Sequence, residues 1–168
     1  PDAKLLDGLT RLRGDASPLG MAHIALAQAA AKASVQTVER EYFNLFVGLA
    51  RGELLPYASY YLTGFLQERP LARLRKDLAH IGIERSETEI EPEDHAALLF
   101  ETMAGLINGE FDAAEGTDRA IFKKHLAPWI GRFFADLEQA KAADFYRCVG
   151  ALGSVFMEIE TEAFALPA

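Results

Sequence analysis

The residues best suited to chemistry stand together in one run, Glu91-Pro92-Glu93-Asp94-His95. Proline suits the first turn of a helix because its φ is preset and it has no N–H to leave unpaired. The run therefore predicts a helix that begins at Pro92, with carboxylates in the first turn, where the helix dipole favours them. Carboxylates beside an imidazole can bind a cationic group, but the same residues can simply start a helix around a satisfied histidine. The residues alone leave both interpretations open.

Patterns for catalysis are scarce in the rest of the sequence. It contains no Gly-rich phosphate loop, no GxSxG sequence and no His-Glu-x-x-His zinc motif. The nearest approach to a di-iron site is one Asp77-x-x-His80 pair, whereas such a site needs two Glu-x-x-His motifs and further carboxylates. Cys148 has apolar neighbours and is expected to be a buried structural thiol. We predict no catalytic residue, no metal and no cofactor, with acid–base chemistry by Asp94 and His95 as the alternative.

Composition and charge limit the classes of partner. The 168 residues suit one domain, and half of them are hydrophobic and a quarter charged, as in soluble globular proteins. The net charge of −8 and the pI near 5.0 argue against nucleic acid and anionic membranes, and are compatible with a basic ligand. A single cysteine excludes an intrachain disulfide and favours a reducing compartment. Because the sequence has neither a membrane-spanning run nor a signal peptide, we expect a cytoplasmic protein.

Helix start and stop signals recur along the chain, and strand signals are almost absent. Serine or proline precedes several periodic apolar segments, and glycine follows several of them. The pattern predicts an all-α, single-domain bundle of about seven to nine helices over residues 1–168. The expected helices lie near residues 5–14, 18–33, 34–48, 57–64, 69–82, 92–107, 117–126, 128–137 and 142–164. The polar residues 83–90 are expected to form an exposed linker that acts as a hinge.

Five segments, taken in order, resemble the TorD/DmsD family of chaperones for molybdoenzymes exported by the twin-arginine pathway. They are residues 41–48 (EYFNLFVG), 56–64 (PYASYYLTG), 71–75 (LARLR), 91–95 (EPEDH) and 125–129 (HLAPW). The resemblance runs from about Val35 to Phe164, and the ordered series is more specific than any one motif. It implies an all-helical fold without catalytic activity. It also implies binding of the twin-arginine signal peptide, and of the folding body, of an apo-enzyme until its molybdopterin cofactor is inserted.

By position, the resemblance implies which residues bind the signal peptide. The polar ones are Asp94, His95 and Glu91, and the others are Tyr42, Leu45, Trp129, Pro128 and His125. A twin-arginine leader carries two guanidinium groups beside an apolar helix-forming stretch, so an acidic helix start beside an aromatic groove complements both parts. Asp94 is the expected direct partner of a guanidinium, because a carboxylate can accept two parallel hydrogen bonds from it.

Two other functions remain open beside this expectation. One is a chaperone for a cytoplasmic nitrate-reductase-type subunit, and the other is a small metal-dependent hydrolase or nucleotide-binding enzyme. The family usually has a further N-terminal helix, which we expect this chain to lack because the segment before Pro1 and the initiator Met are missing. The predicted hinge further suggests a monomer with a minor dimer formed by exchange of helical halves.

Overall fold

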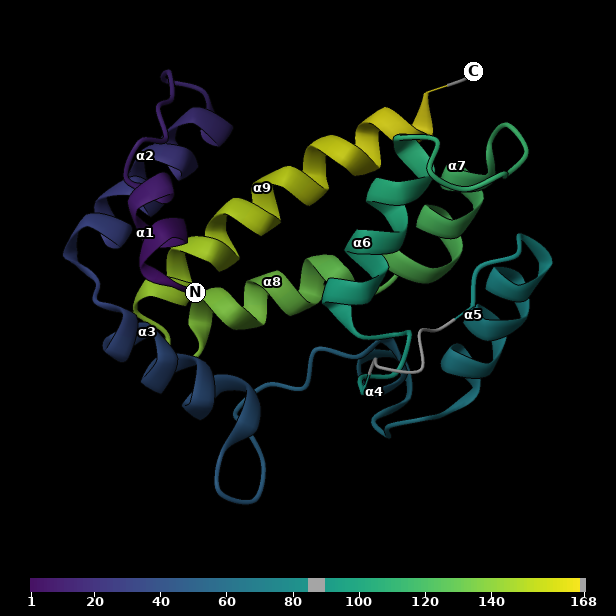
Figure 1. The fold of residues 1–168 in the computed structure, drawn as a ribbon, viewed down its shortest axis with the longest axis horizontal. Helices are drawn as coiled ribbons and strands as arrows, with labels where there is room; N and C mark the ends of the chain where they lie inside the picture. The colour runs from purple at the N-terminus through teal and green to yellow at the C-terminus, as the bar shows by residue number, and fades with distance from the viewer. Residues whose placement is uncertain (85–89, 167–168) are drawn as a thin grey trace. The chain divides into compact units, whose positions relative to one another are not determined.

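The computed structural model describes residues 1–84 and 90–166, and these residues form nine α-helices, two π-helical turns and no β-strand (Figure 1). The all-α prediction is confirmed. The helices form where apolar residues recur at helical spacing between proline, serine and glycine. The described residues group into two compact units, residues 1–55 with 131–166 and residues 56–130. The single domain over residues 1–168 stays a prediction.

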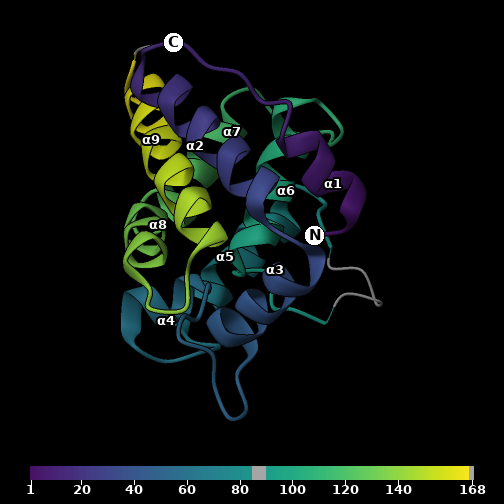
Figure 2. The ribbon, with the colours of Figure 1, turned by 90° about the vertical axis from the view of Figure 1, so that its left-hand side faces the viewer.

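Two long helices, α2 (Pro18–Lys32) and α9 (Phe145–Ala165), lie side by side in the first unit (Figures 1 and 2). The short helix α1 (Ala3–Leu9) contacts α2, and α3 (Val35–Tyr42) contacts α9. The buried core of these helices contains Leu6, Leu26, Ala30, Val38 and Phe145. Leu6, Val38 and Phe145 recur at helical spacing with other apolar residues and are buried as that spacing predicts. Leu5, Tyr42, Phe156 and Ile159 share the same spacing but are exposed.

Serine caps begin α2 and α3, as predicted. The Ser17 side chain accepts a hydrogen bond from Gly20 N at 3.1 Å. Ser34 and Thr37 bond reciprocally, because the side-chain oxygen of each accepts from the backbone N–H of the other. These bonds satisfy N–H groups that have no partner inside a helix. Helix α3 continues into the π-helical turn η1 (Phe43–Val47) and ends at Gly48, whose φ of 62° favours glycine.

Two glycines of α9 let α8 (Ile130–Gln139) approach it closely. A Cβ at Gly150 would lie 2.6 Å from Glu138 N, and a Cβ at Gly153 would lie 2.3 Å from the Phe134 ring. A glycine inside a helix costs about 1 kcal/mol relative to alanine. The close packing of α8 on α9 offsets this cost, and a larger side chain at either position would push the two helices apart.

The second unit contains four helices and one π-helical turn: α4 (Ala58–Thr63), α5 (Arg69–His80), α6 (Ala96–Ile107), α7 (Thr117–Ile121) and η2 (Phe122–Leu126). Helix α4 packs against α5, and α6 packs against α7. Leu71, Leu74 and Leu78 are buried along α5, whereas Arg73 and Lys76 on the same helix are exposed. This separation of apolar and charged faces is the one that the spacing predicts.

The helix expected from Pro92 begins four residues later, so this prediction is wrong. Helix α6 starts at Ala96, and His95 is its N-cap. The N–H of Ala96 donates to Pro56 O, far away in the sequence. A backbone group used in this tertiary contact cannot also start an earlier helical turn, and the periodic pattern carries no sign of such a contact.

Two other predicted helix starts need smaller corrections. The helix expected from residue 128 begins at residue 130, and the last helix begins at residue 145 rather than near 142. The last helix is delayed because the N–H groups of Lys141 and Ala142 donate to the Glu53 side chain. The boundary of a helix depends on such partners as well as on local sequence.

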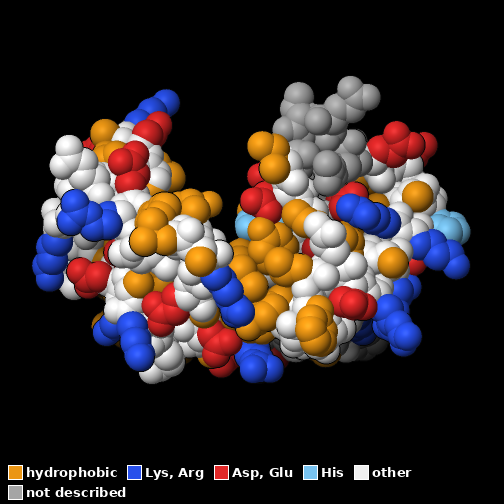
Figure 3. Space-filling model, turned by 90° about the horizontal axis from the view of Figure 1, so that it is seen from below, with side chains coloured by type: hydrophobic (Ala, Val, Ile, Leu, Met, Phe, Trp, Pro, Cys, Tyr) orange, Lys and Arg blue, Asp and Glu red, His pale blue; other side chains and the backbone are white. Residues whose placement is uncertain are grey.

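The predicted hinge at residues 83–90 falls mainly on residues 85–89, which lie outside the described residues. It stays a prediction. In residues 1–84 and 90–166, no helix is long and apolar enough to span a bilayer. On the face drawn in Figure 3, Lys and Arg side chains are interspersed with Asp and Glu side chains.

Candidate binding site

The Glu-Pro-x-Asp-His stretch is joined through its backbone to the start of α4. Tyr57 and His95 form an isolated antiparallel bridge. In this bridge Ala58 N donates to Asp94 O at 2.9 Å, and Ala96 N donates to Pro56 O at 2.8 Å. We call residues 56–59 together with residues 91–97 the signature cluster. The bridge fixes two segments that are distant in sequence against each other.

Asp94 is buried inside the signature cluster. It is 1% exposed, and its Oδ2 accepts a hydrogen bond from Ser59 N at 2.8 Å. Together with the bond from Ala58 N to Asp94 O, this satisfies the first two N–H groups of α4, whose N-cap residue Tyr57 makes no side-chain cap bond. The prediction that Asp94 lies in the first turn of its own helix is therefore wrong, because its carboxylate caps a different helix, α4.

Glu91 and His95 both contact Tyr57. The Tyr57 hydroxyl donates to Glu91 Oε2 at 2.6 Å. The rings of Tyr57 and His95 lie 5.0 Å apart and are inclined by 72°, the edge-to-face arrangement that aromatic rings favour. All three side chains are half-buried. The sequence did not identify Tyr57 as a site residue, although residues 56–64, one of the segments that resemble the family, contain three tyrosines.

His95 also caps α6. Its Nδ1 accepts a hydrogen bond from Ala97 N at 3.1 Å, a role that Ser, Thr, Asp or Asn usually fills. A ring nitrogen that accepts carries no proton, so the neutral ring has its proton on Nε2. The cap and the contact with Tyr57 together fix the orientation of the imidazole.

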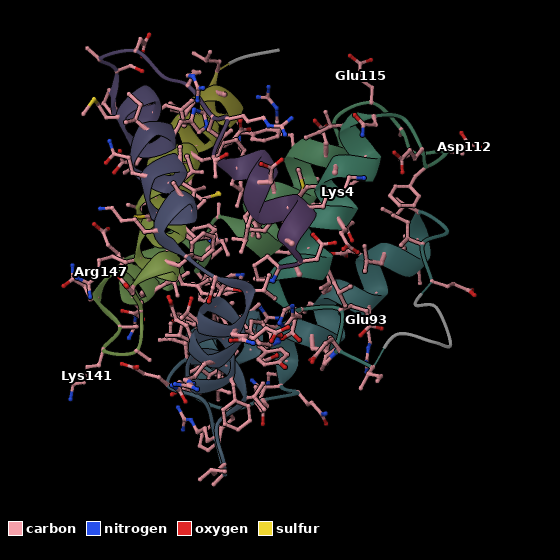
Figure 4. All side chains as sticks on the ribbon, turned by 60° about the vertical axis from the view of Figure 1, so that its left-hand side comes forward. Lys4, Glu93, Asp112, Glu115, Lys141 and Arg147 are labelled. Atoms are coloured by element: carbon pink, nitrogen blue, oxygen red, sulfur yellow. The ribbon has the colours of Figure 1, made fainter. Side chains whose placement is uncertain are left out.

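Glu93, the remaining carboxylate of the stretch, pairs with Arg75 of α5. Arg75 Nε lies 3.0 and 2.9 Å from the two carboxylate oxygens, and Arg75 Nη2 lies 2.8 Å from Oε2. The hydrogen bond to Glu93 raises the pKa of Arg75. Figure 4 shows Glu93 on the segment that precedes α6. One carboxylate of this stretch therefore already binds a guanidinium through several hydrogen bonds.

His125 is buried and shares Asp77 of α5 with Lys124. His125 Nε2 and Lys124 Nζ lie 2.6 and 2.5 Å from Asp77 Oδ2. Burial lowers the pKa of His125 although Asp77 opposes this shift. Burial would raise the pKa of Asp77, but the hydrogen bonds from Lys124 and His125 and their charges lower it. A neutral His125 thus donates its Nε2–H to an ionised Asp77. A cavity of about 50 Å³ lies beside His125, Lys124 and Asp94.

The His-x-x-Pro-Trp motif places one exposed and two buried residues in the second unit. Trp129 is 2% exposed, and its Nε1 donates to His125 O at 2.8 Å. The Trp129 ring centroid lies 5.4 Å from that of Tyr61. Pro128 is exposed. Of the three predicted site residues in this motif, only Pro128 is exposed. His125 and Trp129 are buried in the core of the second unit.

The last two predicted site residues, Tyr42 and Leu45, belong to the first unit. Tyr42 is 48% exposed, and its ring centroid lies 5.2 Å from that of Phe46 and 6.3 Å from that of Tyr146. Leu45 is fully buried. Tyr42 can therefore offer an aromatic surface to a ligand, whereas Leu45 belongs to the core that supports it.

Glu41 has a role that sequence reasoning missed. Its buried carboxylate accepts hydrogen bonds from three N–H groups at the start of α9: Asp144 at 2.8 Å, Phe145 at 3.0 Å and Tyr146 at 2.6 Å. It thus caps α9, whose N-cap residue Asp144 makes no side-chain cap bond. Because more than 100 residues separate donor from acceptor, no local sequence signal could have identified this contact.

Glu53 holds the turn before α9 in a similar way. Its two carboxylate oxygens accept from Lys141 N at 2.7 Å and Ala142 N at 3.0 Å. Figure 4 shows the Lys141 side chain pointing away from this turn. A cavity of about 390 Å³ lies in the same unit, with Lys32, Glu41 and Cys148 among its lining residues, and none of the predicted site residues lines it.

The structure places the residues that the sequence raised as metal-binding or nucleophilic alternatives. No three His, Cys, Asp or Glu side chains among them could hold a metal ion. The two residues of the Asp-x-x-His pair have separate partners, since Asp77 binds Lys124 and His125 while the His80 ring bonds to a backbone carbonyl. Burial raises the pKa of the half-buried Cys148, which disfavours the nucleophilic thiolate.

Comparison with known proteins identifies the family. A family model described as nitrate reductase delta subunit matches residues 13–135. The chaperone protein TorD of Vibrio parahaemolyticus is 25% identical over 131 residues, which cover 72% of this chain and 61% of that protein. TorD of Aliivibrio fischeri is 26% identical over 135 residues, which cover 74% and 63%. This chain thus spans about six-tenths of the length of these curated relatives.

The fold also has a counterpart among solved structures. A protein from Archaeoglobus fulgidus, assigned as a redox enzyme maturation protein, matches with a TM-score of 0.57 and 21% identity. The match covers 91% of this chain and 90% of that one. At this identity the likeness shows the fold alone. The family match, in contrast, includes the signature cluster and the His-x-x-Pro-Trp motif within residues 13–135.

Proposed function

Because this chain belongs to the nitrate reductase delta subunit family, together with the TorD/DmsD chaperones, we propose that it is a non-catalytic chaperone in the maturation of a molybdoenzyme. It binds the twin-arginine signal peptide of the apo-enzyme in the cytoplasm and holds it until the cofactor is inserted and export can follow. The net charge of −8 favours encounter with such a cationic leader.

The signature cluster is the observation that carries this proposal. Glu91 and His95 are half-buried, so part of each side chain is accessible to solvent. A carboxylate in this setting can take a guanidinium through paired hydrogen bonds, as Glu93 takes Arg75 within the chain. Asp94 is 1% exposed and contributes by holding α4 in place. The proposed direct partner of the leader is therefore Glu91 rather than Asp94.

The apolar part of the leader is expected to contact exposed apolar surface of the second unit, where Pro128 is exposed. Tyr42, which is 48% exposed, belongs to the first unit. Tyrosine is apolar in its ring and polar at its hydroxyl, so it suits peptide recognition, and its role is proposed for that unit by itself. The buried residues Leu45, His125 and Trp129 support these surfaces from within their own units.

A chaperone for a cytoplasmic nitrate-reductase-type subunit is the second candidate. The description of the matching family favours it. Such a client has no twin-arginine leader, so its recognition would depend on apolar contacts and would not discriminate arginine from lysine. The acidic groups of the signature cluster favour the first candidate.

Calorimetric titration with three peptides tests the proposal. They are a twin-arginine leader, the same leader with Lys-Lys in place of Arg-Arg, and the N-terminal peptide of a nitrate-reductase-type subunit. We expect tightest binding of the Arg-Arg leader, and Glu91→Gln should weaken it about 5- to 30-fold, because a charge-assisted pair in a partly buried setting contributes about 1–2 kcal/mol.

Glu101→Gln, which removes an exposed carboxylate from α6, is the matched control and should leave the affinity unchanged. Binding of the nitrate-reductase-type peptide alone would favour the second candidate. Failure of the wild-type protein to bind any of the three peptides, or turnover of a substrate by the purified protein, would overturn the proposal.

A further inference from the structure

Tyr57 connects the parts of the signature cluster through three independent contacts. Its backbone pairs with that of His95 in the isolated bridge. Its ring lies edge-to-face against the His95 ring at 5.0 Å. Its hydroxyl donates to Glu91 Oε2 at 2.6 Å. Tyr57 is therefore the side chain that relates the orientation of the Glu91 carboxylate to that of the imidazole.

We propose that Tyr57 is a positioning residue that orients Glu91 for a guanidinium and so makes the site prefer arginine to lysine. This inference rests on the proposed function. A glutamate side chain has several rotatable bonds, and a half-exposed one samples several carboxylate orientations. The bond from the Tyr57 hydroxyl to Oε2 restricts these orientations. Because each carboxylate oxygen accepts more than one hydrogen bond, Oε2 can keep the bond from Tyr57 while a ligand also approaches.

Discrimination follows from the shapes of the two cations. A guanidinium is planar and donates two parallel hydrogen bonds, so it gains most from a carboxylate whose plane is already fixed. An ammonium group is a compact charge on a flexible stem and binds a carboxylate in many orientations. Fixing the carboxylate therefore strengthens the binding of arginine and leaves the binding of lysine nearly unchanged.

Tyr57→Phe removes only the hydroxyl and keeps the ring that packs against His95. We expect the affinity for the Arg-Arg leader to fall about 3- to 10-fold, the range for ordering one flexible side chain. The affinity for the Lys-Lys leader should change less than about 2-fold, so the ratio of the two affinities decreases. If Tyr57 has only a structural role, Tyr57→Phe should lower the affinities for both peptides by the same factor and leave their ratio unchanged.

Two further variants complete the experiment. Tyr146→Phe, which removes a hydroxyl from the first unit, should leave both affinities unchanged. In a Glu91→Gln background, Tyr57→Phe should have no further effect on the ratio, because the oriented carboxylate is already gone.

The inference and the proposed function fail in different ways. If the wild type prefers the Arg-Arg leader and Tyr57→Phe keeps the same preference, the inference alone is overturned. The inference is also overturned if Tyr57→Phe lowers the affinity ratio in the Glu91→Gln background as much as it does in the wild type. If the wild-type protein binds neither leader, the proposed function fails, and the inference fails with it.

Discussion

Each unit of the molecule contains a helix whose N-terminus is capped by an acidic side chain from far away in the sequence. In the first unit, Glu41 binds three N–H groups at the start of α9. In the second, Asp94 binds the Ser59 N–H at the start of α4, and its own backbone oxygen binds the Ala58 N–H. Both acids are buried, and both belong to segments that resemble motifs of the family.

The difference between the two regions lies in what surrounds the cap. Next to Glu41 in the sequence, Tyr42 is exposed but packs on aromatic neighbours. Around Asp94, the half-buried Glu91 and His95 add polar groups that can reach solvent. A motif of a family can thus contain both buried residues that cap helices and partly exposed polar residues, and only the second kind is available for the proposed recognition of a ligand.

The largest expected effect is a loss of stability when the carboxylate that caps α9 is removed. Glu41→Ala leaves three N–H groups at the start of α9 without their acceptor. Since an unsatisfied buried donor costs about 1–3 kcal/mol, we expect the free energy of unfolding to fall by at least about 3 kcal/mol. Chemical denaturation measures this change.

Glu39→Ala is the matched control for Glu41, because Glu39 is exposed on the same helix. Its effect should stay within about 0.5 kcal/mol. If Glu41→Ala proves equally mild, water replaces the carboxylate at the start of α9 and the first cap has no special importance.

Asp94→Ala should have the next largest effect. It removes one charge-assisted hydrogen bond from a fully buried site, which corresponds to a loss of about 1.5–3 kcal/mol of stability. Leader affinity should fall as well, because α4 and Tyr57 lose their support. Asp94→Asn keeps an acceptor for Ser59 N and should recover much of both losses.

Melting and peptide titration of both Asp94 variants sharpen the comparison. Stability and affinity should fall together in Asp94→Ala. If affinity is lost while the melting temperature is unchanged, Asp94 touches the leader directly, and its classification as an architectural residue is wrong.

His95 caps α6 and is also a candidate for binding the leader, and two substitutions can separate these roles. His95→Ala removes the cap of α6, which costs about 1 kcal/mol for a typical N-cap. His95→Asn restores a capping side chain without the imidazole, so its stability should be close to that of the wild type. If the ring contributes to recognition, both variants should bind the leader more weakly to a similar extent. Normal leader affinity in His95→Asn would mean that His95 is only a cap.

Local sequence was sufficient to predict much of the fold. The Ser17 and Ser34 caps and the apolar stripe of α5 follow from short-range rules that depend on neighbouring residues alone. These rules failed where a distant partner controls the local conformation. The start of α6 is delayed by the contact of Ala96 with Pro56, a contact that leaves no periodic trace in the sequence.

The candidate site was predicted less completely, for a related reason. The resemblance to the family selected Glu91, Asp94 and His95 as a group, and the structure brings all three into the signature cluster. Their individual roles depend on burial and on Tyr57 and Ser59, which come from another segment. The sequence assigned the guanidinium to Asp94 because a carboxylate can accept two parallel hydrogen bonds, and it carried no sign that this carboxylate is buried.

The smallest expected effect concerns the pH dependence of stability through His125. Its pKa is lowered mainly by burial, with Lys124 and Arg73 acting in the same direction and Asp77 in the opposite one. An unfolded histidine has a pKa of about 6.5. As the pH falls below that value, the unfolded chain binds a proton before the folded chain does. The free energy of unfolding therefore decreases as the pH falls from about 6.5 towards the lower pKa of folded His125.

Melting temperatures between pH 8 and pH 5 measure this decrease. His125→Gln lacks the titrating ring, so its melting temperature should depend less on pH in this range even if it is lower overall. Asp77 affects stability in a separate pH range. Because its pKa is lowered in the folded state, its contribution to the free energy of unfolding is lost only below about pH 4. A His125→Gln profile as steep as that of the wild type would show that other groups cause the pH dependence. It would also mean that His125 can be protonated in the folded protein almost as easily as in the unfolded chain, so that its surroundings do not disfavour the charged imidazole.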